Sequence, residues 1–317
     1  MSRGLEMDDP IEVVTPEQFK ALEKTVSYEK PVGGFKLPVG YLSNSQVEMY
    51  LRCPMQYEFR YVKSMRRPPS AAMSHGSGTH KALEVTHNHI VDHGEPASTA
   101  EVESAFSDTF DKVLADIPEE SRVEDGLNVH ELKDVGLILV RIYNSKYAPA
   151  VRPSVGKDGV RGIEKRFEVL VAGVPMVGII DLIDTNSDVS VSKTEKEFMT
   201  LHGKEIPAIL RTAIADFKTK SKSMSEAEVV GSLQLSLYSY VEQIPAVRID
   251  QLLKLKTPKI TRITTLRTAQ DHAWMKNVVH GVARAITAGI FPPCDPTHWV
   301  CSEKWCGYWA LCRGRRT

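Results

Sequence analysis

Hydrophobic positions recur at helical spacing through the first half of the chain. Ser43 is followed three residues later by Gln46, a capping pattern that predicts a helix ending near Cys53, where Pro54 removes a backbone donor. The further stretches predicted to be helical are a short helix carrying Tyr57, Phe59 and Tyr61, then 74–93, 98–116 and 128–147.

The second half changes to the two-residue alternation of strands. Residues 162–171 and 176–184 alternate on either side of Gly173-Val174-Pro175, which predicts a β-hairpin. The later predicted elements are strands at 211–218, 247–256 and 260–267, and helices at about 225–243 and 269–289. This order of helices, hairpin, strand, helix, strands and helix predicts an α/β fold with a mixed central sheet flanked by helices.

Two polar stretches lack this periodicity. Residues 1–37 predict a tail or a loosely docked arm, and residues 186–210 predict an insertion or a long hairpin loop. We therefore expect an N-terminal arm followed by a single domain over 38–317 that the insertion interrupts.

The composition is that of an ordinary globular protein, with 42% hydrophobic and 25% charged residues among 317 and a net charge of zero. Because the chain is neutral, any DNA affinity must come from local basic patches. No stretch reaches the roughly 18 apolar residues of a membrane helix, and the polar N-terminus has no signal-peptide core. We expect a cytoplasmic protein with no membrane partner.

An acidic and lysine group lies at the ends of two predicted strands. Asp181 ends one strand, and Asp216 and Lys218 lie two apart on another, so these two share a face. Carboxylates bind Mg²⁺ or Mn²⁺, and a lysine can orient the attacking water or offset phosphate charge. The alternative is that both aspartates are strand-end turn residues and that the lysine is simply solvated.

The C-terminal stretch CSEKWCGYWALCRG holds three of the five cysteines. Its spacing fits a metal site, a disulfide knot or a packed aromatic end. An odd number of cysteines argues against a complete disulfide framework, and cytosolic cysteines are more often metal ligands or catalytic groups.

The order of motifs resembles the RecB-like branch of the PD-(D/E)XK nucleases. More narrowly, it is similar to the iron–sulfur nucleases that include CRISPR-associated RecB-like exonucleases, the AddB nuclease domain and related phage exonucleases. The matching positions are Cys53, Gly76 to His80, Gly178 to Asp181, Asp216 to Lys218, Gln234 to Tyr238, and Cys301, Cys306 and Cys312. The gap of 34 residues between Asp181 and Asp216 is longer than this family usually shows.

The resemblance implies a restriction-endonuclease-like core with a divalent-metal site. It implies that His80, Asp181 and Asp216, with the Phe217 carbonyl, bind Mg²⁺ or Mn²⁺, and that Lys218 is the catalytic lysine. It also implies that Gln234 and Tyr238 line the active site and help to place the DNA. Glu164 matches a common acidic position, although an outward-facing strand glutamate is an equal alternative. Among the five histidines of 75–93 we expect only His80 to be functional.

The resemblance also implies that Cys53, Cys301, Cys306 and Cys312 hold a 4Fe-4S cluster that joins the N- and C-terminal helical parts. Four-cysteine Zn²⁺ is the alternative, because it uses the same ligands. Cys294 is left out of this set.

Basic residues gather in local stretches despite the neutral total. The expected DNA contacts are Lys220, Lys222, Lys254, Lys256 and Arg262, and Lys63, Arg66 and Arg67 form a further basic stretch. Tyr57, Phe59 and Tyr61 could stack on bases, although such aromatic residues more often lie in a core.

The function expected from the resemblance is a metal-dependent DNA exonuclease of recombination, repair or phage DNA processing. Its expected partners are DNA that is single-stranded or has free ends, and a helicase or recombinase. The alternative is a catalytically silent DNA-binding iron–sulfur or zinc protein that acts as a recombination partner. A redox iron–sulfur protein would leave the aspartates and Lys218 unexplained.

Overall fold

The computed structural model describes residues 33–66, 71–117, 119, 128–187 and 211–313. Most of the predicted arm and nearly all of the predicted insertion lie outside these residues. The described end of the arm contacts the domain, since the Lys36 backbone N–H donates to Thr287 Oγ1 at 3.0 Å and Phe35 packs against the core.

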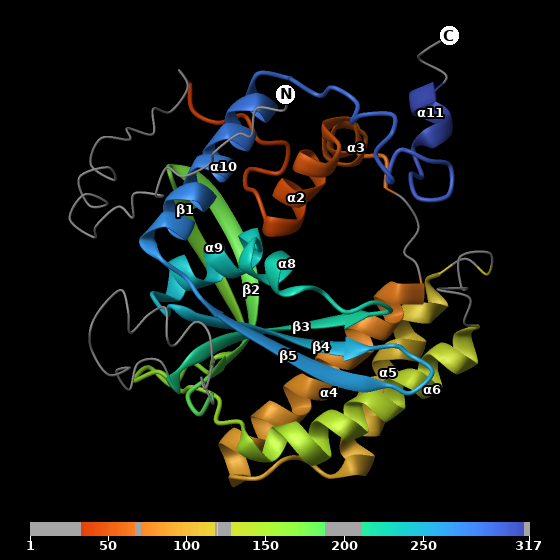
Figure 1. Cartoon of the computed structure of the whole chain (residues 1–317), viewed down its shortest axis with the longest axis vertical. Helices are drawn as coiled ribbons and strands as arrows, with labels where there is room; N and C mark the ends of the chain where they lie inside the picture. Colours follow the sequence, from red (N-terminus) through yellow and green to blue (C-terminus); the bar gives the residue numbers. More distant parts are fainter. Residues whose placement is uncertain (1–32, 67–70, 118, 120–127, 188–210, 314–317) are drawn as a thin grey trace, which may run out of the picture.

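Three helices form a layer on one face of the sheet (Figure 1). They are α4 (Ala71–His93), α5 (Thr99–Ala115) and α6 (Val129–Ile142), and they confirm the predicted helices of the first half. The side chains of Ser98 and Asn128 accept hydrogen bonds in capping boxes at the starts of α5 and α6. The predicted helix 128–147 continues past Ile142 as the π-helical turn η3 (Tyr143–Tyr147) and the 3-10 turn η4 (Ala148–Ala150).

The sheet has five strands in the order β1-β2-β3-β4-β5. Their bounds are Ile163–Val171, Val174–Asp184, Ala213–Lys220, Ala246–Leu253 and Lys259–Leu266. Only β3 and β4 pair in parallel among these strands, because a helical crossover joins them, and the other neighbours are antiparallel. This confirms the predicted mixed sheet with flanking helices.

The turn of the first hairpin lies one residue earlier than predicted. Val171 pairs with Val174, and Pro175 already belongs to β2, so the connection consists of Ala172 and Gly173 alone. Both residues have a positive φ, at 49° and 78°. Such two-residue loops match the right-handed twist of a hairpin, which explains why the prolyl residue lies within the strand that follows.

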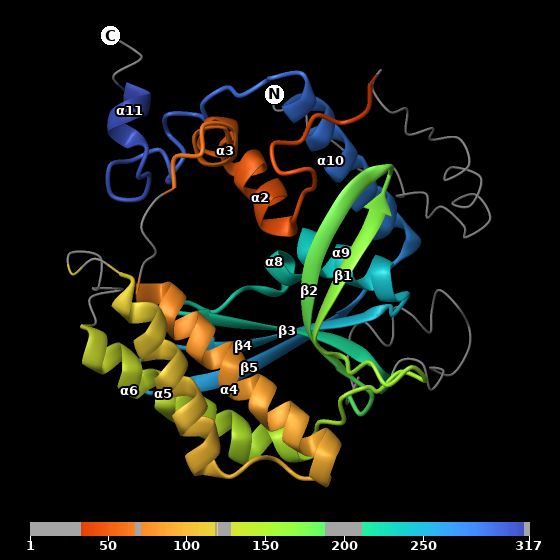
Figure 2. The same cartoon turned by 180° about the vertical axis from the view of Figure 1, so that it is seen from behind.

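The crossover contains two helices where the sequence predicted one over 225–243. The helix α8 (Glu226–Val230) ends at Gly231, and Ser232 then caps α9 (Leu233–Glu242) by accepting a hydrogen bond from the Leu235 N–H. With α10 (Ala269–Thr287), α9 covers the sheet face opposite α4 (Figure 2). Alternate residues of β3 therefore enter different cores, with Ile214 among α9 and α10 and Phe217 among α4 to α6.

The first helices of the described chain lie beside its C-terminal segment, above the sheet in the view of Figure 1. The N-terminal elements are α2 (Asn44–Arg52), α3 (Pro54–Tyr57) and the π-helical turn η1 (Glu58–Val62), and the C-terminal one is α11 (Trp309–Arg313). The Phe59 and Tyr308 rings stack with centroids 5.2 Å apart, and the Tyr308 hydroxyl donates to the Met65 carbonyl at 2.7 Å. Sequence-distant segments thus form one small unit.

Candidate active site

Two neighbouring strands bring the predicted aspartates together. Regular pairing of β2 with β3 ends at Leu182 and Ala215, so Asp181 and Asp216 follow directly at the point where the strands separate. Both aspartates are buried. Asp181 Oδ2 accepts a hydrogen bond of 2.8 Å from the Phe217 backbone N–H, which fixes the orientation of its carboxylate. The aspartate pair is therefore built into the sheet.

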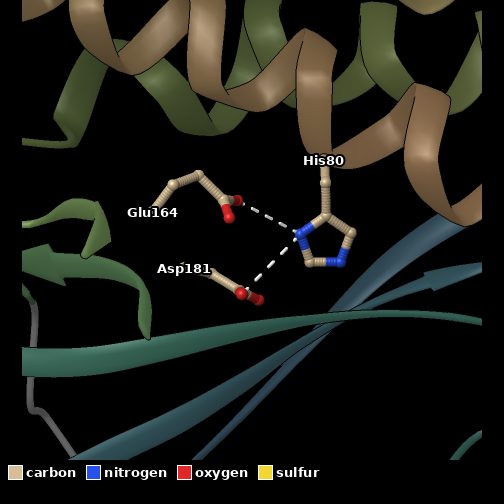
Figure 3. A group of neighbouring side chains, drawn as sticks. All are labelled: His80, Glu164 and Asp181. Atoms are coloured by element: carbon tan, nitrogen blue, oxygen red, sulfur yellow. Dashed lines mark hydrogen bonds and ion pairs between the residues drawn. The ribbon is translucent and has the colours of Figure 1, made fainter. Parts of the chain in front are cut away.

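A histidine and a glutamate complete a compact group of donor atoms with Asp181. His80 extends from α4 toward the carboxylates of β1 and β2 (Figure 3), with its Nδ1 atom 3.3 Å from Glu164 Oε1 and 3.7 Å from Asp181 Oδ1. One donor atom from each of the three residues lies within 4.8 Å of the other two. The two carboxylates supply the oxygen ligands that Mg²⁺ and Mn²⁺ prefer, so this part of the donor set fits the expected ion.

Glu164 enters this group through an unusual backbone conformation. Its φ is +44°, in the left-handed region that side chains other than glycine rarely adopt. The pairing of β1 with β2 is interrupted there, between Ile163–Leu182 and Lys165–Ile180, where Glu164 would face Asp181. Simple alternation along a strand could not reveal this placement. Backbone strain of this kind is often found at functional sites.

Negative charge dominates the electrostatics of the group. Burial alone would lower the pKa of His80, but the hydrogen bond to Glu164 and the charges of Asp181, Glu164 and Asp216 raise it to about 9. Burial, followed by the charge of Asp216, raises the pKa of Asp181 well above its usual range. Asp181 therefore holds its proton more tightly than an ordinary aspartate, and the negative potential of the group favours a divalent cation.

Lys218 connects the aspartates to the helix α9. Its Nζ atom donates to Asp216 Oδ1 at 3.1 Å, lies 2.9 Å from Oδ2, and donates to Gln234 Oε1 at 2.9 Å. The chain continues as Gln234 Nε2 donates to the Tyr238 hydroxyl at 2.7 Å, and this hydroxyl donates to the Ile179 carbonyl at 2.6 Å. Burial opposes the charge of Lys218, but Asp216 and Asp181 outweigh it and raise the lysine pKa.

Among the sequence-predicted residues, the structure brings His80, Asp181, Asp216, Lys218, Gln234 and Tyr238 together, and it adds Glu164. Asp216 contacts Lys218 instead of joining the compact group, and the Phe217 contact is made by its backbone N–H. The other helix histidines lie elsewhere: His75 and His87 are buried, and His89 and His93 pack ring to ring. Within the described part of the chain, His80 is the one histidine in a compact group of potential metal ligands.

A cavity of about 750 Å³ opens beside Lys218, Gln234 and Tyr238. Its basic wall residues are Arg60, Arg66 and Arg166, which come from separate segments. The five predicted DNA contacts do not line it. One of them, Arg262, forms a two-bond ion pair with the buried Asp250 at 2.8 and 2.9 Å, so its charge is already matched. The stretch containing Arg66 is basic in the sequence, whereas nothing in the sequence links it to Arg166.

The aromatic residues near Cys53 divide between core and cavity. Tyr57 and Phe59 are fully buried, at 0% and 3% exposed, which confirms the core interpretation. Tyr61 is half-buried and lines the cavity wall.

The cysteines gather near α3 in two sets. Cys306 Sγ accepts a hydrogen bond from Gln56 Nε2 at 3.2 Å, and Cys312 Sγ donates to Met55 Sδ at 3.3 Å. The Cys294 thiol lies beside Cys53 and Cys301, and burial with these two neighbours raises its pKa to about 12. All five cysteines are free, and no three sulfur atoms of the described chain lie within 4.8 Å of one another. The predicted four therefore form no compact single-ion site in this conformation.

The fold and this group of acidic, histidine and lysine side chains are those of a nuclease. The chain belongs to the PD-(D/E)XK nuclease superfamily, whose family model matches residues 41–194 and 208–313. The crystal structure of SSO0001 is similar at 13% sequence identity, a TM-score of 0.36 and 94% coverage of each chain. An exonuclease candidate from Eubacterium rectale is similar at 12% identity and a TM-score of 0.43, covering 84% of this chain and 87% of that one. No curated protein matches the chain.

Among the helices that the structure describes, none is both long and apolar enough to cross a membrane.

Proposed function

We propose that this protein is a Mg²⁺- or Mn²⁺-dependent DNA exonuclease of the RecB-like, iron–sulfur type. The observation that carries the proposal is the meeting of two groups at one point of the sheet. These are the donor atoms of His80, Glu164 and Asp181, and the chain from Asp216 through Lys218 to Gln234. A metal site next to a charged lysine matches the needs of phosphodiester hydrolysis.

The residues divide the work of hydrolysis. His80, Asp181 and Asp216 would hold the cation, with the Phe217 carbonyl and Glu164 as further ligands. A bound divalent cation lowers the pKa of water and offsets the charge that develops on the phosphate. The raised pKa of Lys218 keeps its Nζ charged, so this group positions water and stabilises phosphate oxygens.

The bond chemistry follows from a water attack on phosphorus. A new P–O bond forms from the water, and the bond to the 3′ oxygen breaks. The water releases a proton, the departing 3′ oxygen gains one, and the product carries a 5′-phosphate. Gln234 and Tyr238 hold the lysine in place, because both amide atoms of Gln234 are already engaged.

A 4Fe-4S cluster on Cys53, Cys301, Cys306 and Cys312 is the structural part of the proposal. Segments from both ends of the chain converge on α3, through the Gln56–Cys306 and Met55–Cys312 contacts. Cluster thiolates bind different irons, so they need not converge on one point as the ligands of a single Zn²⁺ ion do. We assign the protein to the cytoplasm and to recombination, repair or phage DNA processing beside a helicase or recombinase.

The test uses end-labelled single- and double-stranded DNA incubated with Mg²⁺, Mn²⁺ or a chelator. We expect cleavage from the ends with either metal, none with the chelator, and none with Lys218→Ala. The control is that Lys218→Ala still binds DNA and melts as the wild type does. A wild-type protein that binds DNA but never cleaves it with Mn²⁺ would instead support the catalytically silent DNA-binding protein.

A further inference from the structure

The cavity of about 750 Å³ joins the catalytic group to a wall from the N-terminal part of the chain. Lys218 and Gln234 line one side. Further lining residues come from the segments 39–48 and 60–66, and the β1–β2 hairpin contributes Arg166 and Gly178. A molecule in this space would therefore contact the charged lysine and three further segments at once.

The charge of the wall favours a polyanion. Arg60, Arg66, Arg166 and Lys218 supply four positive charges, and Glu48 is the acidic residue that faces them. Within the described residues Arg60 and Arg66 have no carboxylate partner. The pair of Arg166 with Glu168 at 2.7 Å is exposed on both sides, so it is worth little and exchanges readily for a phosphate.

Aromatic rings alternate with these arginines. Tyr61 lines the cavity, and the Arg60 guanidinium lies 5.6 Å from its ring centroid. Tyr41 also lines it and is 39% exposed, although a tyrosine ring usually prefers burial. Positive charge interleaved with aromatic faces is the chemistry that binds unpaired bases and their backbone.

The wall is held in position from behind. The Tyr308 hydroxyl donates to the Met65 carbonyl, and Phe59 stacks on the Tyr308 ring, so the segment between them is fixed at both ends. Ser64 within it has a φ of +55°. Because this wall is already ordered, it loses little conformational entropy when a flexible ligand binds.

We propose that this cavity binds a short run of a single DNA strand next to the bond that is cut, with Arg60, Arg66 and Arg166 on its phosphates and Tyr41 and Tyr61 on its bases. The proposal rests on the proposed nuclease function. The space lies within the roughly 300–1,000 Å³ of small-ligand pockets, which is room for a few nucleotides of one strand. We expect it to favour a single strand over the wider paired duplex.

The experiment measures the affinity of a fluorescent oligothymidylate in a chelator, without cleavage, over a series of salt concentrations. Single strands lose about 0.7 in the slope of log affinity against log salt for each phosphate contact, so Arg60→Ala/Arg66→Ala/Arg166→Ala should reduce the slope by about 2. The matched control is Lys112→Ala/Lys146→Ala/Lys157→Ala, which removes three exposed charges outside the cavity and should leave the slope unchanged. A lysine version of the cavity variant should restore most of the affinity.

Equal slopes for the wild type and the cavity variant, or a loss confined to the control variant, would overturn the proposal. So would equal affinity for a duplex of the same length. If the cavity variant does not fold, ultraviolet cross-linking of wild type to an iododeoxyuridine oligonucleotide decides. Cross-links within 41–66 support the site, and cross-links within 254–262 exclude it. Because no step needs metal or cleavage, a failure of the nuclease function shows only in the separate cleavage assay.

Discussion

The carboxylate site and the cysteine-rich C-terminal end differ in how closely their potential metal ligands lie together. In the first, donor atoms from α4, β1 and β2 lie within 4.8 Å of one another, and the Phe217 N–H holds the second oxygen of Asp181. In the second, Cys306 and Cys312 form hydrogen bonds with Gln56 and Met55, while Cys294 lies beside Cys53 and Cys301.

The two sites differ because different structural elements hold their side chains in place. Strand pairing and a long helix fix the carboxylate site, so its geometry does not depend on the ion. Loops carry most of the cysteines, and here neighbouring side chains satisfy their sulfur atoms. We infer that the carboxylates govern chemistry with little effect on stability, and that the cysteines govern stability with little effect on the bond-breaking step.

The largest expected effect is on catalysis. Asp181→Asn keeps an oxygen that can accept from Phe217 N–H but removes the charge that binds the cation. We expect DNA cleavage with Mn²⁺ to fall by roughly 10³-fold or more, as for the loss of a positioned catalytic group. End-labelled DNA assayed at several metal concentrations measures this loss.

The same variant should not be less stable, because Asp181 is crowded by like charge. The folded protein binds the Asp181 proton more tightly than the unfolded chain, since the pKa is raised. This stability is present below the unfolded pKa of about 4 and is lost as pH rises through the folded value. In a chelator, Asp181→Asn should therefore lose less stability than the wild type between acid and neutral pH. A strongly unfolded variant would show that Asp181 is mainly structural.

The second effect is on the joining of the chain ends. If a cluster spans Cys53 and the C-terminal cysteines, Cys53→Ser opens a closure of about 250 residues. By analogy with covalent closure of a long loop, we expect about 5 kcal/mol less free energy of unfolding, with loss of bound iron. Anaerobic urea unfolding and iron analysis measure both. Unchanged unfolding together with full iron would remove Cys53 from the ligand set.

The sequence predicted the regular part of the carboxylate site and not its irregular part. Residues two apart share a face of a strand, which placed Asp216 and Lys218 together. Residues four apart share a face of a helix, which placed Gln234 and Tyr238 together. Both patterns depend only on near neighbours in the sequence. Glu164 could not be assigned, since its role depends on a left-handed backbone residue inside a strand.

The predicted DNA contacts show that prediction from sequence is also limited for contacts between distant segments. A run of basic residues in the sequence says nothing about which of them are already paired, and Arg262 forms an ion pair with Asp250. Arg166 lies about 100 residues after Arg60 and Arg66 in the sequence, and the three line one cavity only because the fold brings the β1–β2 hairpin to the segment 60–66. Sequence patterns within one segment do not predict such contacts between distant segments.

A smaller effect is expected at the far end of the lysine chain. Tyr238→Phe removes the hydroxyl that donates to the Ile179 carbonyl and accepts from Gln234. One buried hydrogen bond contributes about 1 kcal/mol, and a loosened Lys218 should lower the cleavage rate by roughly 10-fold. Thermal unfolding and initial cleavage rates check these values. A loss as large as that of Asp181→Asn would place Tyr238 in the chemistry itself.

The smallest expected effect tests the cysteine assignment most closely. The Cys294 thiol lies beside Cys53 and Cys301, yet Cys294 stands in a proline-rich stretch outside the motif Cys301-x4-Cys306-x5-Cys312. We expect Cys294→Ser to keep its iron and its unfolding midpoint, while Cys306→Ser loses both. If instead Cys294→Ser loses iron and Cys306→Ser keeps it, the Gln56 bond to Cys306 is the permanent arrangement and Cys294 is the ligand.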